Sequence, residues 1–142
     1  MSALFELNAG VQNTLFHNNI VRFGGPQASG VNCNNANNKI YDNNIYGLTI
    51  GSTPTSYARI YNNLFYNNGV TEISFLSNST NNELFSNTIY HNQSGHGIRT
   101  QNSKWNKIIN NIVWVKTGYA IYNDNGTIIE NHNCMFKEDL MA

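Results

Sequence analysis

The chain has 142 residues, and its eight basic and eight acidic residues give a formal net charge of zero. This balance argues against a nucleic-acid partner, and no stretch approaches the roughly 20 apolar residues of a membrane span. The length predicts one domain, residues 1–142. No basic region followed by an apolar run opens the chain, so no signal peptide is visible and the compartment stays unknown.

Asparagine occurs 28 times, and much of it belongs to a repeated pattern. The pattern is an apolar residue, two variable residues, Asn, one variable residue and a second apolar residue. In chain order it occupies residues 15–20, 40–45, 60–65, 84–89, 108–113 and 128–133, and in the last copy Asn133 replaces the final apolar residue. Short runs of Ile, Phe and Tyr, broken by Asn and Gly, indicate strands rather than helices.

A second strand is predicted before most copies, often after a glycine, as in residues 30–33, 47–50, 97–100 and 120–122. Each repeat of 20 to 25 residues is too short to bury an apolar face alone, so neighbouring coils must stack. Stacking predicts an inward ladder in which each Asn bonds to the coils above and below. The ladder would contain Asn18, Asn43, Asn63, Asn87, Asn111 and Asn131.

Two inward apolar columns are predicted beside this ladder, one from each end of the pattern. The first contains Leu15, Ile40, Ile60, Leu84, Ile108 and Ile128, and the second contains Ile20, Ile45, Phe65, Ile89 and Val113. A parallel column two residues before the first apolar position contains Asn13, Asn38, Ala58, Asn82, Asn106 and Gly126. The sequence therefore predicts an all-β solenoid, a parallel β-helix of about six coils with an inward Asn ladder.

From Leu4 to Phe136 this pattern resembles the pectate-lyase-like family of right-handed parallel β-helix repeat proteins. The resemblance implies a right-handed coil and a history of acting on polysaccharides. A leucine-rich repeat is the alternative, but it needs more Leu at fixed offsets. Family members usually have capping segments and more coils, so either a fragment or a minimal chain with open ends fits. We expect a homodimer through the open N-terminal coil, around Leu4, Phe5, Leu7 and Leu15.

Three outward columns are the candidate binding surface. Two are aromatic: one contains Val21, Tyr46, Tyr66, Tyr90, Trp114 and Cys134, and the other contains Phe16, Tyr41, Tyr61, Phe85, Ile109 and Ile129. The third is charged and contains Thr14, Lys39, Arg59, Glu83, Lys107 and Thr127. The aromatic rings either hold flat sugar faces or shield the sheet, and the charges either hold an acidic sugar or form a solvated ladder. The candidate polysaccharide-binding residues are Tyr46, Tyr66, Tyr90, Trp114, Lys39, Arg59 and Lys107.

Catalytic signals are incomplete. Gly95-His96-Gly97 is similar to a motif of polygalacturonases, but the acidic motifs that accompany it there are missing, so we interpret it as a turn. A calcium-free lyase would need a base and a neutralising group, for which the candidates are His91, His96, Arg99 and Lys116. No metal-ligand spacing or cofactor motif is present. The sequence favours a non-catalytic structural or carbohydrate-binding module; the alternative is a lyase or glycoside hydrolase acting on an acidic polysaccharide.

Overall fold

The computed structural model describes residues 55–77 and 79–138 and, between residues 3 and 50, the strands alone. Side chains are described for residues 47–50, 57–77 and 79–138, and for Ile20. The side chains of the predicted dimer interface lie outside this set, as do the two predicted ladder residues Asn18 and Asn43.

The described strands form three parallel sheets of six strands each, which we call sheets A, B and C. Sheet A contains β1 (Ala3–Glu6), β4 (Ser29–Asn32), β7 (Tyr46–Ile50), β11 (Thr71–Phe75), β15 (His96–Gln101) and β18 (Tyr119–Asp124). Sheet B contains β2 (Phe16–His17), β5 (Asn35–Ala36), β9 (Arg59–Tyr61), β13 (Glu83–Phe85), β16 (Asn106–Ile109) and β19 (Ile128–Asn131). Sheet C contains β3 (Ile20–Arg22), β6 (Lys39–Tyr41), β10 (Leu64–Tyr66), β14 (Thr88–His91), β17 (Ile112–Val115) and β20 (Cys134–Lys137).

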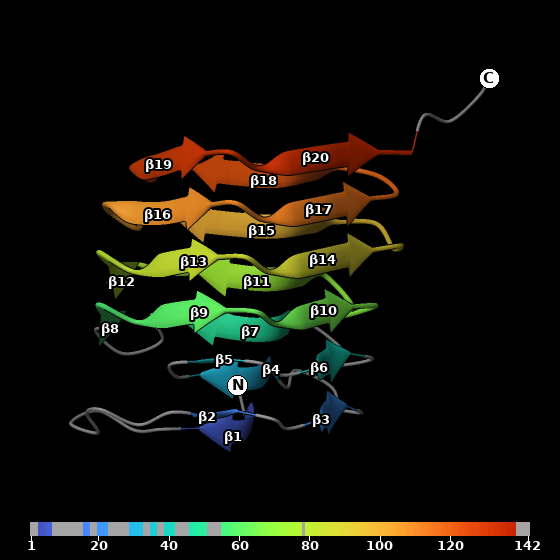
Figure 1. Cartoon of the computed structure of the whole chain (residues 1–142), viewed down its shortest axis with the longest axis horizontal. Coiled ribbons are helices and arrows are strands. Elements are labelled where there is room, and N and C mark those ends of the chain that lie inside the picture. Colours follow the sequence, from blue (N-terminus) through green and yellow to red (C-terminus); the bar gives the residue numbers. More distant parts are fainter. Residues whose placement is uncertain are drawn as a thin grey trace.

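Each coil of the chain contributes one strand to each sheet, and the short pair β8 (Thr55–Ser56) and β12 (Ser79–Thr80) extends one corner. Figure 1 shows sheets B and C side by side in one layer, with sheet A behind them and the coils stacked along one axis. Because every strand pairs with its counterpart in the next coil, side chains at equivalent positions form columns about 4.8 Å apart. The predicted all-β solenoid is confirmed.

The interior is built from the predicted columns. In sheets B and C these are Ile60, Leu84 and Ile108, and Phe65, Ile89 and Val113; sheet A adds Leu48, Ile73 and Ile98, and all nine are buried. Between sheets B and C, Asn87 Oδ1 accepts hydrogen bonds of 3.0 Å from the backbone and side chain of Asn63. Asn111 accepts the equivalent pair from Asn87. The amides thus satisfy one another inside the stack.

The register of the last coil differs from the prediction. Asn111 donates to Asn133 Oδ1 at 2.9 and 3.1 Å, so the ladder ends in Asn133 rather than Asn131. Strand β19 is shifted by two residues, which pairs Ile108 with Glu130 and Asn106 with Ile128. The reason is the bend: a left-handed residue precedes each ladder Asn, and His132, with φ of 52°, takes this place in the last coil.

The second coil also has a different register. Strand β6 pairs Ile40 with Phe65 and Lys39 with Leu64, so Lys39 lies in sheet C and not beside Arg59 in sheet B. Tyr46 lies in sheet A, in register with Thr71, instead of in the Tyr66 column. In the next coil an apolar residue precedes an aromatic residue twice, at Ile60-Tyr61 in sheet B and at Phe65-Tyr66 in sheet C. Ile40-Tyr41 can be aligned with either pair, and only strand pairing distinguishes the two alignments. In the first coil, Ile20 is exposed rather than inward.

Candidate functional site

A charged row crosses the outer face of sheet B. Glu83 lies between two basic residues of the neighbouring coils, with Arg59 Nε at 3.3 Å and Lys107 Nζ at 3.0 Å from its carboxylate oxygens. The bond from Lys107 is the largest cause that lowers the pKa of Glu83, and the charge of Arg59 lowers it further. The predicted charged column is therefore present for three coils, with two cations and one anion.

Stacked rings flank this row. Tyr61 and Phe85 lie parallel, with ring centroids 5.0 Å apart, and the Arg59 guanidinium lies 5.1 Å from the Phe85 centroid. An open groove of about 360 Å³ follows the same face. Its lining includes Arg59, Glu83, Phe85, Lys107, Ile109 and Asn110. The groove thus combines a flat apolar surface with donors and acceptors of both charges.

The second aromatic column lies on sheet C, in the same layer as sheet B (Figure 1). Tyr66, Tyr90 and Trp114 are in register on successive strands. The Tyr90 and Trp114 rings stack with centroids 4.4 Å apart, and 41% of Tyr90 is exposed. Phe136 extends the register in the last coil, where Cys134 was predicted. Among the predicted binding residues, Arg59 and Lys107 lie on sheet B, whereas Tyr66, Tyr90 and Trp114 lie on sheet C.

Sheet A carries a different cluster at its far end. His96 stacks on Tyr122 with centroids 4.4 Å apart, and its Nδ1 accepts a hydrogen bond of 3.2 Å from the Tyr119 backbone N–H. Arg99 pairs with Asp124 at 2.7 Å. Partial burial is the largest cause that lowers the pKa of His96, and the charges of Arg99 and His91 lower it further. The neutral imidazole is therefore favoured.

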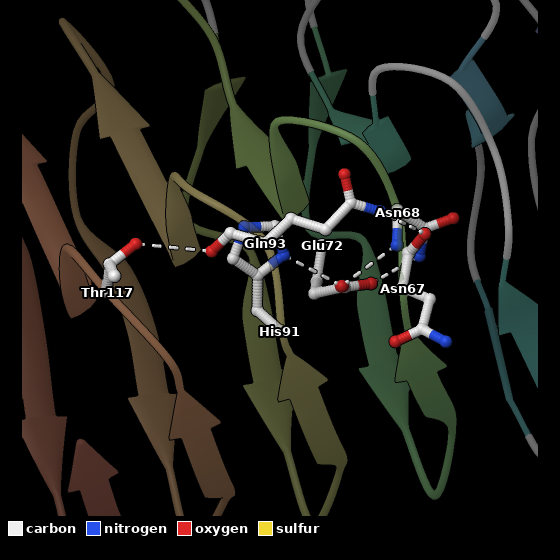
Figure 2. Close-up of polar contacts among 6 residues, drawn as sticks. All are labelled: Asn67, Asn68, Glu72, His91, Gln93 and Thr117. Carbon is white, nitrogen blue, oxygen red and sulfur yellow. Dashed lines mark hydrogen bonds and ion pairs between the residues drawn. The ribbon is translucent and has the colours of Figure 1, made fainter. Parts of the chain in front are cut away.

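The interior of the corner between sheets C and A holds a buried polar cluster, drawn in Figure 2. Glu72 Oε1 lies 2.9 Å from His91 Nδ1 and accepts a 3.0 Å hydrogen bond from the Asn68 backbone N–H. The Asn68 side chain donates to the other carboxylate oxygen. All three residues are fully buried, and desolvation raises the pKa of Glu72 although its hydrogen bonds oppose the shift.

Sequence reasoning missed the partnership of Glu72 with His91. The two residues lie on different strands and are 19 positions apart, a separation that no short motif covers. One weak signal was available: by the sheet A register, Glu72 occupies the place that glycine holds in the flanking coils, at Gly47 and Gly97. A Cβ on Gly97 would lie 2.6 Å from Val113, so this column points into the stack.

The four predicted catalytic candidates do not share one accessible surface. His91 is fully buried, and its Nε2 has no hydrogen-bond partner among the described residues. His96 and Arg99 lie on β15, while Lys116 lies exposed in the turn between β17 and β18. Gly95, which precedes His96, has a packing role, because a Cβ there would lie 2.0 Å from the Val70 carbonyl oxygen. Gly95 lies in the bend before β15, whereas His96 and Gly97 belong to the strand, so the predicted turn holds only for the first of the three residues.

Among the described residues, no group of three or more His, Cys, Asp or Glu side chains converges as metal ligands. Within the same part of the chain, no helix is long and apolar enough to span a membrane.

Comparison with known proteins identifies the family alone. No curated protein and no solved structure gives a significant match to this chain. The family model described as the right-handed β-helix region matches residues 6–136, which is most of the sequence. With its three parallel sheets and continuous interior columns, the chain belongs to the right-handed β-helix family.

Proposed function

We propose that this protein is a non-catalytic module that binds an acidic polysaccharide along the groove of sheet B. The observation that carries the proposal is the row of Arg59, Glu83 and Lys107 beside the stacked rings of Tyr61 and Phe85. A sugar ring has an apolar C–H face that packs on aromatic rings, and hydroxyls that bond to charged side chains.

The charges of the row favour an acidic ligand. The row itself contains two cations and one carboxylate, so its own net charge is positive and attracts a uronate. Arg59 supports this role because a guanidinium binds carboxylates through paired hydrogen bonds. The side chains are partly exposed, so a ligand can reach them without unfolding any strand. Added salt should weaken such a complex, since exposed charges are screened over about 8 Å at physiological ionic strength.

A calorimetric titration with oligogalacturonides and neutral cello-oligosaccharides tests the proposal. The double variant Arg59→Gln/Lys107→Gln should lose about tenfold in affinity for the acidic ligand, equivalent to about 1.4 kcal/mol. Lys116→Gln is the matched control, because it removes one exposed cation from a turn outside sheet B. Equal loss in the control, or no binding by the natural protein, would contradict the proposal.

The second candidate function is a lyase or hydrolase that uses sheet A. The observation in its favour is that His96, whose pKa is lowered by burial, lies on the same strand as Arg99. A neutral imidazole can accept a proton, and a guanidinium can neutralise a uronate. We expect no release of unsaturated uronate from polygalacturonate. Cleavage that His96→Ala abolishes, with an unchanged circular dichroism spectrum, would favour the enzyme instead.

A further inference from the structure

Two large aromatic residues adopt a backbone conformation that suits neither of them. Tyr57 has φ of 62° and Trp105 has φ of 57°, in the left-handed region that side chains with a Cβ rarely enter. Asn81 holds the equivalent place in the coil between them, with φ of 53°. Asn is a favoured non-glycine residue there, because its short amide bonds locally. The two aromatic residues thus replace a better-suited residue type at the same bend.

Burial does not account for these aromatic residues. Tyr57 is 74% exposed and Trp105 is 56% exposed, so most of the surface of each residue is accessible to solvent. The backbone of the bend is regular, with the Tyr57 N–H donating to the Thr80 carbonyl and the Asn81 N–H donating to the Lys104 carbonyl. A residue held in an unfavourable conformation while its side chain contributes little packing is a feature of functional sites.

The exposed aromatic residues occur in the same coils as the cations of the charged row. Tyr57 precedes Arg59 by two residues, and Trp105 precedes Lys107 by two. In the coil between them the corresponding residues are Asn81 and Glu83, and strand pairing places Arg59, Glu83 and Lys107 in one register. Of these three coils, the first and the third therefore have an aromatic residue and a cation at this edge of sheet B. Two coil spacings amount to about 10 Å along the stack.

We propose that Tyr57 and Trp105 form a stacking platform for alternate rings of a polysaccharide that runs along the axis of the stack. Arg59 and Lys107 then pair with a carboxylate on every second sugar. An extended pyranose chain advances by roughly one strand spacing per residue, so its disaccharide repeat matches two coils. The ligand class is thus a glycan in which acidic and neutral sugars alternate. This inference rests on the proposed function and specifies its ligand.

The test replaces each aromatic residue with the residue of the intervening coil. Tyr57→Asn/Trp105→Asn should reduce affinity for hyaluronan oligosaccharides, whose acidic and neutral sugars alternate, by about tenfold or more. Because Asn suits the left-handed bend, the same variant should have an equal or higher thermal midpoint. The natural protein should prefer hyaluronan oligosaccharides to oligogalacturonides of equal length, and Arg59→Gln/Lys107→Gln should reduce binding to both.

The outcomes separate this inference from the proposed function. Unchanged affinity in Tyr57→Asn/Trp105→Asn, with loss in Arg59→Gln/Lys107→Gln, would overturn the platform and leave the sheet B groove as the binding site. A lowered thermal midpoint would also overturn it, since the rings would then serve folding. Preference for oligogalacturonides would overturn the alternating ligand. No glycan binding by the natural protein would overturn both proposals.

Discussion

Glu72 and Glu83 lie in the same coil of the solenoid, yet their surroundings shift their pKa values in opposite directions. Glu72 is fully buried between His91 and Asn68, and burial raises its pKa. The Glu83 side chain is 35% exposed between Arg59 and Lys107, and these cations lower its pKa. An ionised carboxylate is costly in the interior unless it is fully bonded, whereas at the surface water already stabilises it. The buried cluster is therefore suited to fixing how the coils stack, and the exposed row is suited to binding a ligand.

The largest difference should follow removal of the basic partner of each glutamate. His91→Ala should destabilise the protein by about 3–5 kcal/mol, because it removes the buried basic partner of Glu72 and leaves the carboxyl group with its bonds to Asn68 alone. Lys107→Ala should cost at most about 1 kcal/mol, since exposed ion pairs contribute little. Urea denaturation followed by circular dichroism gives both values. Similar losses in the two variants would show that burial does not distinguish the two sites.

The Asn ladder provides the next largest effect. Asn87→Leu should cost about 1–3 kcal/mol, because it leaves the Asn63 N–H and the Ile60 carbonyl without their buried partner. The control is Asn92→Leu, at an exposed position where φ is not left-handed. Asn102 would be a poor control, because its φ of 49° disfavours Leu. Equal thermal midpoints for the Asn87 and Asn92 variants would refute the structural role of the ladder.

The last coil allows a smaller and sharper comparison. Asn133 accepts two hydrogen bonds from Asn111 and donates at 2.7 Å to the Ile108 carbonyl. Asn133→Ala should cost about 1 kcal/mol. Asn131→Ala, two residues earlier and exposed, should change the free energy of unfolding by less than about 0.5 kcal/mol. The reverse order would restore the register that the repeated pattern first suggested.

These two asparagines show how far the sequence determines the fold. Inward columns such as Ile60, Leu84 and Ile108 were predictable because side chains alternate between the two faces of each strand, and the bend beside these strands has the same length in each coil. The register of the last coil was not predictable, since a two-residue shift places the apolar Met135 opposite Val113. In the second coil the shift is five residues, which pairs Ile40 with Phe65. The discriminating signal is the left-handed residue before the ladder, which sequence pattern alone does not reveal.

The two candidate sites also differ in how well the sequence predicts them. The row of Arg59, Glu83 and Lys107 follows from equivalent positions in successive strands, so the repeat predicts it directly. The bond between Glu72 and His91 joins strands of different sheets across a corner whose shape depends on loop length. Local alternation contains no information about that contact. Surface columns of a solenoid are therefore easier to predict than contacts across its interior.

The smallest predicted effect is a difference in the sign of pH dependence. Glu72 has a folded-state pKa above its usual 4.5, so its contribution to stability is fully present below pH 4.5 and is lost as pH rises through the folded-state pKa. Glu83 has a lowered pKa, so its contribution is present above pH 4.5 and is lost as pH falls through the folded-state pKa. Subtracting the free energy of unfolding of Glu72→Gln, measured by urea denaturation, from that of the natural protein should give a difference that falls with rising pH. The Glu83→Gln difference should rise with pH, by at most about 1 kcal/mol because the pair is exposed. His91 bonds to Glu72, so Glu72→Gln also alters that bond. Slopes of the same sign would show that the two carboxylates occupy similar environments, contrary to the contrast between interior and surface.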